Sequence, residues 1–244
     1  MIKALLFDLN GTVIDILTDE SRDEIYRTVA NLLSFHGAAI TADELRDWYW
    51  QLNKEMRRDS DEEFPEFDVL EIFRAIIDRR AGEFTSNLSA EKQRMLPGIL
   101  AGAFRAASLF KLQLYPGVRE VLNYLRSGYT MAAVSDAQRI WAVAELECVG
   151  LTGFFQPLVI SSDLGFRKPD PRMFKSTLDT LGITPDEAIF VGNDMYRDVW
   201  GAHQAGMKTV FFKSGQGDQK SRGVEPDYII YNFGQLPDAV RFLS

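Results

Sequence analysis

The feature that most constrains this chain is a series of short, continuously apolar runs, each followed by a polar residue. The first run covers 4–7 and is followed by Asp8. Others cover 130–134, 157–160 and 188–191, and helix-like segments lie between them. Strands buried on both faces lose the polar alternation of a half-exposed strand, and parallel neighbours need long crossover connections. The pattern therefore predicts an α/β fold built on a parallel sheet.

Helix signals separate the later runs. The segment Tyr115-Pro116-Gly117 begins a predicted helix that Gly128 ends. Asp170, followed by proline, is typical of a helix N-cap, and Gly182 closes that helix. The remaining predicted elements are a short helix that Gly206 ends, two strands at 208–212 and 227–230, and a last helix at 236–243.

Polar side chains follow four of the apolar runs within three residues, and these are Asp8, Ser135, Ser161 and Asp194. Parallel strands end at the same edge of a sheet, and ligands bind at that edge near the switch in strand order. We therefore expect a Rossmann-like three-layer core with these side chains gathered on one edge.

Residues 18–112 carry a different, helical pattern. Four amphipathic stripes follow one another, and Thr41 with Glu44 predicts a capping box before the second. The fourth stripe runs from about Ser89 to Phe110, and Pro97-Gly98 is expected to break or kink it.

These patterns predict two units. An α/β core would comprise 1–17 and 113–244, and an all-helical cap would comprise 18–112. Two chain crossings would join them, which suits a lid that opens and closes over the strand ends. The alternative is a helical bundle packed rigidly on the core.

Composition excludes several classes of function. The net charge is −8, so nucleic acid and membrane surfaces are not expected partners. Two histidines and one cysteine leave little material for a zinc cluster, and one cysteine forms no internal disulfide. No apolar run approaches the roughly 18 residues of a membrane span, and the N-terminus does not resemble a signal peptide. We expect a cytoplasmic protein that is a monomer or a homodimer.

Asp8 is the best candidate for a reacting group. An aspartate is ionised at neutral pH and can attack phosphorus without a base, forming an acyl phosphate. A divalent cation would remove the repulsion between the two anions, and Mg²⁺ suits a site with few oxygen ligands. Asp194 could supply a second carboxylate ligand, and Asp198 could orient Lys168 or hold a metal-bound water.

Other strand-end residues fit the same chemistry. Lys168, in GFRKPDP, could bring positive charge to the phosphate. Ser135 and Thr12 offer hydroxyls, and Gly11 would let the backbone approach closely. Each feature alone is weak evidence, but their joint order along the chain is specific.

Four segments together resemble the haloacid dehalogenase superfamily over essentially the whole chain. FDLNGTVID resembles its first motif, VSDA its second, GFRKPDPRMF its third and VGNDMYRDVWGAHQAG its fourth. The helical insert lies where members with a cap between the first two motifs carry it. The resemblance implies a Mg²⁺-dependent hydrolase, and most often a phosphatase for a small phosphorylated metabolite.

The resemblance also implies a role for each matching residue. Asp8 would be the nucleophile and a metal ligand, and Asn10 would bind the metal through its backbone carbonyl. Asp194 would be a further metal ligand, supported by Asp198. Thr12 and Ser135 would bind the phosphate group, and Lys168 would neutralise charge. Asn193 occupies the first acidic place of the fourth motif, so either Asn193 or Asp194 could face the metal.

Asn10 is the main departure from the family pattern. Phosphatases of the family carry an aspartate here, which protonates the leaving group and later activates water. Asparagine exchanges no proton, and general acid–base help is worth roughly 10²–10⁴-fold. We therefore expect a phosphatase that acts slowly or prefers good leaving groups.

Three alternatives remain open. Asn10 also fits a regulatory protein that binds metal and phosphate without turnover. A haloacid dehalogenase is disfavoured by the acidic pair Asp194 and Asp198, because dehalogenases need no metal. A phosphonate hydrolase needs a cap lysine, for which Lys54 is the main candidate. The candidates for contact with substrate are Trp48, Trp50, Arg57 and Arg58.

Overall fold

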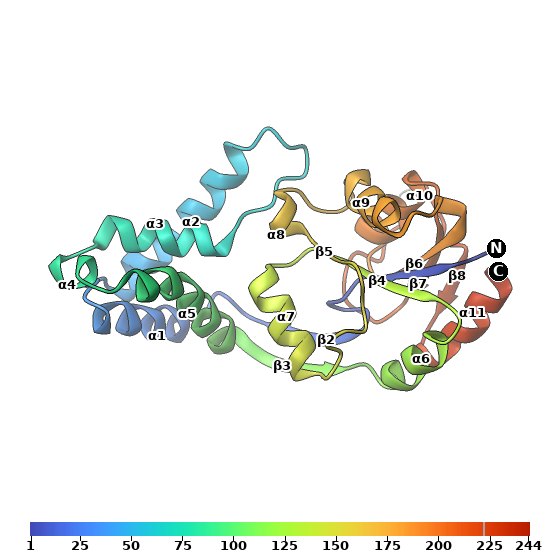
Figure 1. Cartoon of the computed structure of the whole chain (residues 1–244), viewed down its shortest axis with the longest axis horizontal. Helices are drawn as coiled ribbons and strands as arrows, with labels where there is room; N and C mark the ends of the chain where they lie inside the picture. Colours follow the sequence, from blue (N-terminus) through green and yellow to red (C-terminus); the bar gives the residue numbers. More distant parts are fainter. Residues whose placement is uncertain (222) are drawn as a thin grey trace.

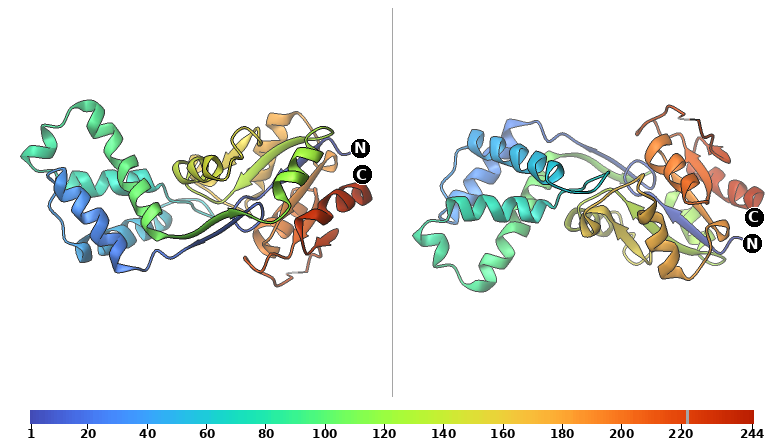
Figure 2. Two further views of the ribbon diagram at one scale, coloured as in Figure 1. Left: turned by 90° about the horizontal axis from the view of Figure 1, so that it is seen from below. Right: turned by 90° about the horizontal axis from the view of Figure 1, so that it is seen from above.

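The computed structural model describes residues 1–221 and 223–244. An α/β part and a helical part lie next to each other along the long axis of the molecule (Figure 1). The other two views show the same separation, and both chain termini lie at the far end of the α/β part (Figure 2).

The α/β part is built on a six-stranded parallel sheet with strand order β5-β4-β1-β6-β7-β8. The strands are β1 (Ala4–Phe7), β4 (Thr130–Ser135), β5 (Leu158–Ile160), β6 (Ala188–Gly192), β7 (Lys208–Phe212) and β8 (Tyr228–Ile230). From β1 the chain builds β4 and β5 on one side and then β6 to β8 on the other. The switch in strand order therefore lies at β1, which places Asp8 where such sheets bind ligands.

Helices cover both faces of the sheet, which confirms the predicted three-layer fold. One face packs on α6 (Val118–Leu125), α7 (Arg139–Cys148) and α11 (Leu236–Leu243), and the other on α9 (Pro171–Leu181) and α10 (Gly201–Gln204). The shorter helices are α8 (Ser161–Leu164), η1 (Pro185–Glu187), η2 (Met195–Trp200) and η3 (Phe233–Gln235).

The alternation within β1 shows why its sequence is continuously apolar. Leu5 and Phe7 belong to the core on one face, and Ala4 and Leu6 belong to the core on the other. All four side chains are buried. Burying each large apolar side chain contributes roughly 1.5–3 kcal/mol, so β1 is anchored from both sides.

The helical part has a core of its own. Its helices are α1 (Asp23–Phe35), α2 (Ala42–Arg58), α3 (Val69–Arg80), α4 (Glu83–Ser86) and α5 (Ala90–Ser108). Thr41 and Glu44 form the predicted capping box at the start of α2. Stacked Tyr49 and Phe104, with ring centroids 4.5 Å apart, lie at the centre of this core.

Two expectations in this part need correction, the first of them only for the predicted break at Pro97. Pro97 does not break α5, which continues from Ala90 to Ser108. Buried Leu96, Leu100 and Phe104 hold the helix on its neighbours, and this packing offsets the one hydrogen bond that proline removes.

The second error concerns the end of the fourth stripe. Residues 109–114 form β3 (Leu109–Leu114), which pairs antiparallel with β2 (Ile14–Thr18), instead of extending the helix to Phe110. The two chain crossings are thus a paired ribbon. Its pairing partner lies almost a hundred residues away, so a local pattern could not reveal it.

The helical part contacts the α/β part at α7 and at the loop after α2. Trp141 on α7 stacks on Phe104 at 6.2 Å and donates a hydrogen bond to the Ala101 carbonyl. Glu66, in the loop, donates its backbone N–H to the Gly165 carbonyl. These contacts fix one arrangement of the two parts, and lid movement remains a prediction.

Within the described part of the chain, none of the helices combines the length and apolar character that crossing a bilayer would require.

Candidate active site

A small pocket of about 150 Å³, called the inner pocket below, lies at the carboxyl ends of the central strands. The residues that line it are Asp8, Asn10, Asp136, Lys168, Asn193, Asp194, Arg197 and Asp198. Five of these are site residues predicted from the sequence. Strand ends far apart along the chain therefore meet here as the parallel sheet requires.

A buried ion triad forms the floor of the inner pocket. The Lys168 ammonium lies 2.7 Å from Asp8 Oδ1 and 2.6 Å from Asp198 Oδ1. All three residues are at most 6% exposed. Burial alone would lower the pKa of Lys168, but Asp198 and Asp8 raise it above its ordinary value. Lys168 is therefore a permanent cation beside the predicted nucleophile.

Asp198 also holds the turn that follows β6. Its Oδ2 accepts the backbone N–H groups of Asn193 and Asp194 at 3.0 and 2.9 Å. Gly192 permits this close return, because a Cβ there would lie 2.4 Å from the Asp198 Cβ. Burial raises the pKa of Asp198 to about 6, and the Lys168 ammonium opposes that rise. Asp198 thus contacts Lys168 directly, as its predicted role in orienting Lys168 requires.

The loop after β1 places Thr12 beside Asp8, although Thr12 is fully buried and does not line the inner pocket itself. Gly11 adopts a left-handed conformation with φ of +88°, which favours glycine. The Thr12 hydroxyl lies 2.9 Å from Asn193 Oδ1 and 3.3 Å from Asp8 Oδ2, so it can donate to one of them.

Asp194 and Asn193 have different surroundings. Asp194 Oδ1 accepts the backbone N–H groups of Tyr196 and Arg197, and Oδ2 accepts from the Arg197 guanidinium and the Asp218 N–H. Burial would raise the pKa of Asp194, but these donors lower it. Asn193 instead directs its amide oxygen to Thr12. The structure thus brings Asn193 to the nucleophile side and uses Asp194 as a helix cap.

Three buried polar atoms at the strand ends have no hydrogen-bond partner among the described residues. They are Asn10 Oδ1, Ser135 Oγ and Asp136 Oδ2. Ser135 ends β4 and is 1% exposed, although it does not line the inner pocket itself. Leaving buried polar groups unpaired costs free energy, and such groups mark places where a polar ligand is expected.

Sequence analysis missed Arg197 and Asp136 at this site, and of these two Asp136 has a carboxylate oxygen without a hydrogen-bond partner among the described residues. Its Oδ1 accepts the Lys168 backbone N–H at 2.9 Å, and its side chain is 9% exposed. Burial raises its pKa to about 6, against the opposing effects of Lys168 and Arg197. The available signal was its place directly after Ser135 in VSDA, at a strand end.

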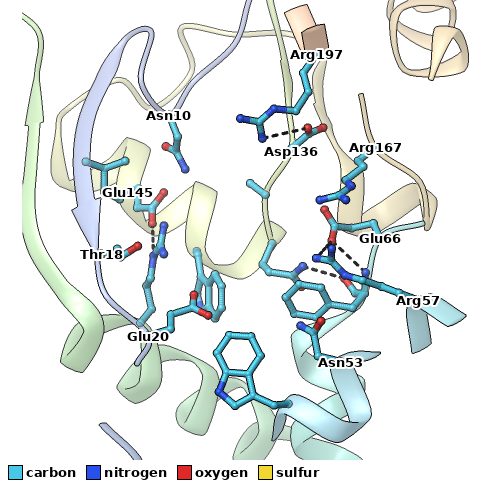
Figure 3. Close-up of a pocket in the computed structure, with 17 residues that line it drawn as sticks. Asn10, Thr18, Glu20, Asn53, Arg57, Glu66, Asp136, Glu145, Arg167 and Arg197 are labelled. Atoms are coloured by element: carbon cyan, nitrogen blue, oxygen red, sulfur yellow. Dashed lines mark hydrogen bonds and ion pairs between the residues drawn. The ribbon is translucent and has the colours of Figure 1, made fainter. Parts of the chain in front are cut away.

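A larger cleft of about 470 Å³, called the outer cleft below, lies between the two parts (Figure 3). Arg105 pairs with Glu145 at 2.7 Å, and Arg57 lies 3.4 Å from Glu66. The Arg167 guanidinium lines the cleft without an ion-pair partner in the ranges that the structure describes.

The lining of the outer cleft shows which of the candidate aromatic and basic residues of the helical part face the α/β part. Trp50 and Arg57 line it, whereas Trp48 lies against Arg80 in the helical part. Arg58 pairs with Asp59 on the surface. Lys54 is exposed, and the residues that line the outer cleft include no lysine.

The inner pocket and the outer cleft share Asn10, Asp136 and Arg197. These three side chains therefore form the mouth between the two cavities. Figure 3 shows Asn10 on one side of the upper end of the cleft, and Asp136 with Arg197 on the other. Arg197 lies 3.8 Å from Asp136 Oδ2.

Comparisons with known proteins place this geometry in context. A family model described as haloacid dehalogenase-like hydrolase matches residues 2–206. The chain is 29% identical to a glyceraldehyde 3-phosphate phosphatase of Methanopyrus kandleri, over 100% of this chain and 99% of that protein. It is 27% identical to a phosphoglycolate phosphatase of Agrobacterium fabrum, over 96% of this chain and 91% of that protein.

Solved structures show the same fold. A 2-haloacid dehalogenase from Pseudomonas syringae pv. Tomato DC3000 matches with a TM-score of 0.68 at 21% identity, covering 100% of both chains. A HAD phosphatase from Thermococcus onnurineus matches with a TM-score of 0.58 at 24% identity, covering 98% of both chains. At these identities the likeness concerns the fold alone.

Proposed function

Since the chain belongs to the haloacid dehalogenase-like hydrolases, we propose that it is a phosphatase for a small phosphorylated metabolite, working through an aspartyl-phosphate at Asp8. Its relatives named as phosphatases match over nearly their whole length, which supports action on phosphate esters. Helices 18–112 would serve as the cap that covers the bound substrate.

The observation that carries the proposal is the buried pairing of Asp8 with Lys168, together with three buried polar atoms that have no hydrogen-bond partner among the described residues. Asp8 is a nucleophile whose repulsion of a phosphate group is reduced by the adjacent ammonium. Thr12 and Ser135 would bind phosphoryl oxygens through their hydroxyls. The leaving group would extend through the mouth into the outer cleft.

A divalent metal fits the inner pocket in its donor chemistry. The side-chain donors around Asp8 include carboxylate and amide oxygens, and Asn10 Oδ1 is a buried acceptor without a described partner. No three His, Cys, Asp or Glu side chains in the described ranges are grouped so as to hold a metal. Mg²⁺ suits such a site because it accepts few protein ligands and keeps several waters.

We propose that Asp8 and the Asn10 carbonyl hold the Mg²⁺, with Asn193 or Asp194 as the third ligand. When bound, the ion would neutralise negative charge on the phosphoryl group.

Phosphate release across a panel of phosphorylated metabolites, with Mg²⁺, tests this function. We expect turnover of at least one small substrate, and we expect Asp8→Asn, which keeps the side-chain shape, to abolish it. If no panel member is hydrolysed and phosphate nevertheless binds, the regulatory alternative replaces the proposal.

The other two alternatives have less support. The residues that line the outer cleft include no lysine, so nothing there favours a phosphonate hydrolase. Chloride release from 2-chloropropionate without metal would instead identify a dehalogenase.

A further inference from the structure

We propose that Asp136 is the general acid and base of this site and takes the role that an aspartate at position 10 has in related phosphatases. This inference rests on the proposed phosphatase function. It concerns a side chain that has no role among the residues predicted from the family motifs.

The position of Asp136 is the first argument. In a phosphoryl transfer the leaving oxygen lies opposite the attacking oxygen, in line through phosphorus. With Asp8 in the inner pocket, the leaving oxygen must lie toward the mouth and the outer cleft. Asp136 is one of the three residues at that mouth, and its Oδ2 is buried and free of hydrogen-bond partners among the described residues.

The chemistry of the mouth is the second argument. Asn10 has an amide, which neither gives nor takes a proton at ordinary pH. Arg197 is held as a cation by Asp194 and Asp136, which keep its pKa above the ordinary value despite burial. Asp136 is therefore the only mouth residue that can exchange a proton with a leaving oxygen.

The groups around Asp136 have opposing effects on its pKa. The Lys168 ammonium and the Arg197 guanidinium favour the carboxylate, whereas burial and the Asp198 carboxylate favour the acid. The balance leaves the pKa of Asp136 at about 6, near the range in which an acid–base catalyst works best at neutral pH. The Lys168 backbone N–H binds Oδ1, and Oδ2 lies 3.8 Å from Arg197 without a hydrogen bond among the described residues, so a leaving oxygen could bind Oδ2.

The two steps balance as follows. In the first, an Asp8 oxygen bonds to phosphorus, the bond to the ester oxygen breaks, and that oxygen keeps the electron pair and takes the Asp136 proton. In the second, solvent water attacks phosphorus and gives a proton to the Asp136 carboxylate. The bond between phosphorus and Asp8 breaks, its electron pair returns to Asp8, and inorganic phosphate leaves.

The test compares leaving groups in the full-length protein. For Asp136→Asn we expect kcat/KM to fall roughly 10²–10⁴-fold on an alkyl phosphate, which needs the acid. On p-nitrophenyl phosphate, whose leaving group departs without protonation, we expect a fall of less than about 10-fold. Asp238→Asn is the matched control, because it removes an exposed aspartate at the far end of the core.

A second variant separates catalysis from structure. Asn10→Asp in the Asp136→Asn background places a carboxyl group at the same mouth, and we expect it to restore about 10-fold or more of the alkyl phosphatase activity. Equal losses on both substrates, or no loss on either, would overturn the role of Asp136.

The wild-type protein provides a test that does not depend on any variant. The ratio of kcat/KM for the alkyl phosphate to that for p-nitrophenyl phosphate should fall as pH rises through the titration of Asp136. A ratio independent of pH would contradict the inference. If the wild type hydrolyses no phosphate ester at all, the proposed function itself fails, which is a different result.

Discussion

The inner pocket and the outer cleft adjoin each other but are built in different ways. The inner pocket is lined by residues that follow β1, β4 and β6, including part of η2, and by Lys168 from the loop before α9. The Asp8–Lys168–Asp198 triad forms its floor. The outer cleft takes its side chains from both parts of the molecule, and its charged groups come from helices and connecting segments.

This difference suggests that the inner pocket determines the reaction and the outer cleft determines the selectivity for substrate. The edge of a sheet places reactive groups within hydrogen-bond distance of one another, and the strands allow these groups few other positions. A surface between two packed units can change its side chains without disturbing the strands beneath. We therefore expect substitutions in the inner pocket to change rate and stability, and substitutions in the outer cleft to change substrate affinity.

The largest effect is expected when the triad loses its cation. Lys168→Met leaves Asp8 and Asp198 as buried carboxylates without their ammonium partner, which should lower the free energy of unfolding by about 3–5 kcal/mol. Chemical denaturation followed by circular dichroism measures this loss.

Lys175→Met is the matched control for that experiment. It removes an exposed ion pair with Asp179, and we expect it to cost less than about 1 kcal/mol. Similar losses in the two variants would mean that the inner pocket has no special contribution to stability.

The next effect concerns the metal. If Asn193 provides the third ligand, Asn193→Ala should raise the Mg²⁺ concentration for half-maximal activity by roughly 10–100-fold. Asp194→Ala should shift it less and should mainly lower stability, since it removes a helix cap. A Mg²⁺ titration of phosphate release compares the two, and the reverse order would assign the ligand to Asp194.

A smaller effect is expected in the outer cleft. Arg167 is half-buried there and has no ion-pair partner in the described chain, so it is free to bind an anionic group of the substrate. Arg167→Gln should raise KM by about 10-fold while kcat changes little, because it removes binding remote from the reacting atoms.

Initial-rate kinetics on the best panel substrate would test the role of Arg167. Arg241→Gln, on the exposed face of α11, serves as the control. A fall in kcat with KM unchanged would break the proposed separation between the two cavities.

The smallest expected effect is a gain in stability. The ordinary pKa of an aspartyl carboxyl is 3.8, and burial raises that of Asp136 to about 6. Between these values the folded protein binds more protons than the unfolded chain, so the free energy of unfolding falls as pH rises. Asp136→Asn should therefore be more stable than wild type at pH 7–8, by about 1–3 kcal/mol.

Thermal melts of wild type and Asp136→Asn at pH 4 and pH 8 would measure the difference. The advantage of the variant should be largest at pH 8 and should shrink toward pH 4. An equal advantage at both values would show that charge at Asp136 is not its cause.

Local patterns predicted the parts of the molecule whose structure depends on nearby residues. The apolar runs predicted the strands. Because parallel strands end at one edge of the sheet, the same pattern predicted that Asp8 would lie near Lys168 and Asp198. The Thr41 capping box was equally local and was found as predicted. The β2–β3 ribbon was missed because its two segments lie almost a hundred residues apart along the chain, and a local pattern does not show which distant segment a strand pairs with.

By itself, the sequence determined that a carboxylate would stand at the end of a central strand with a lysine and further acids near it. Hydrophobic periodicity and the common edge of a parallel sheet are sufficient reasons for that. Only the tertiary structure decided that Asn193 faces Thr12 while Asp194 caps a helix, and that Asp136 is buried at the mouth. Burial and charged neighbours set a side chain's proton affinity and its partners, and both come from segments that lie far apart along the chain.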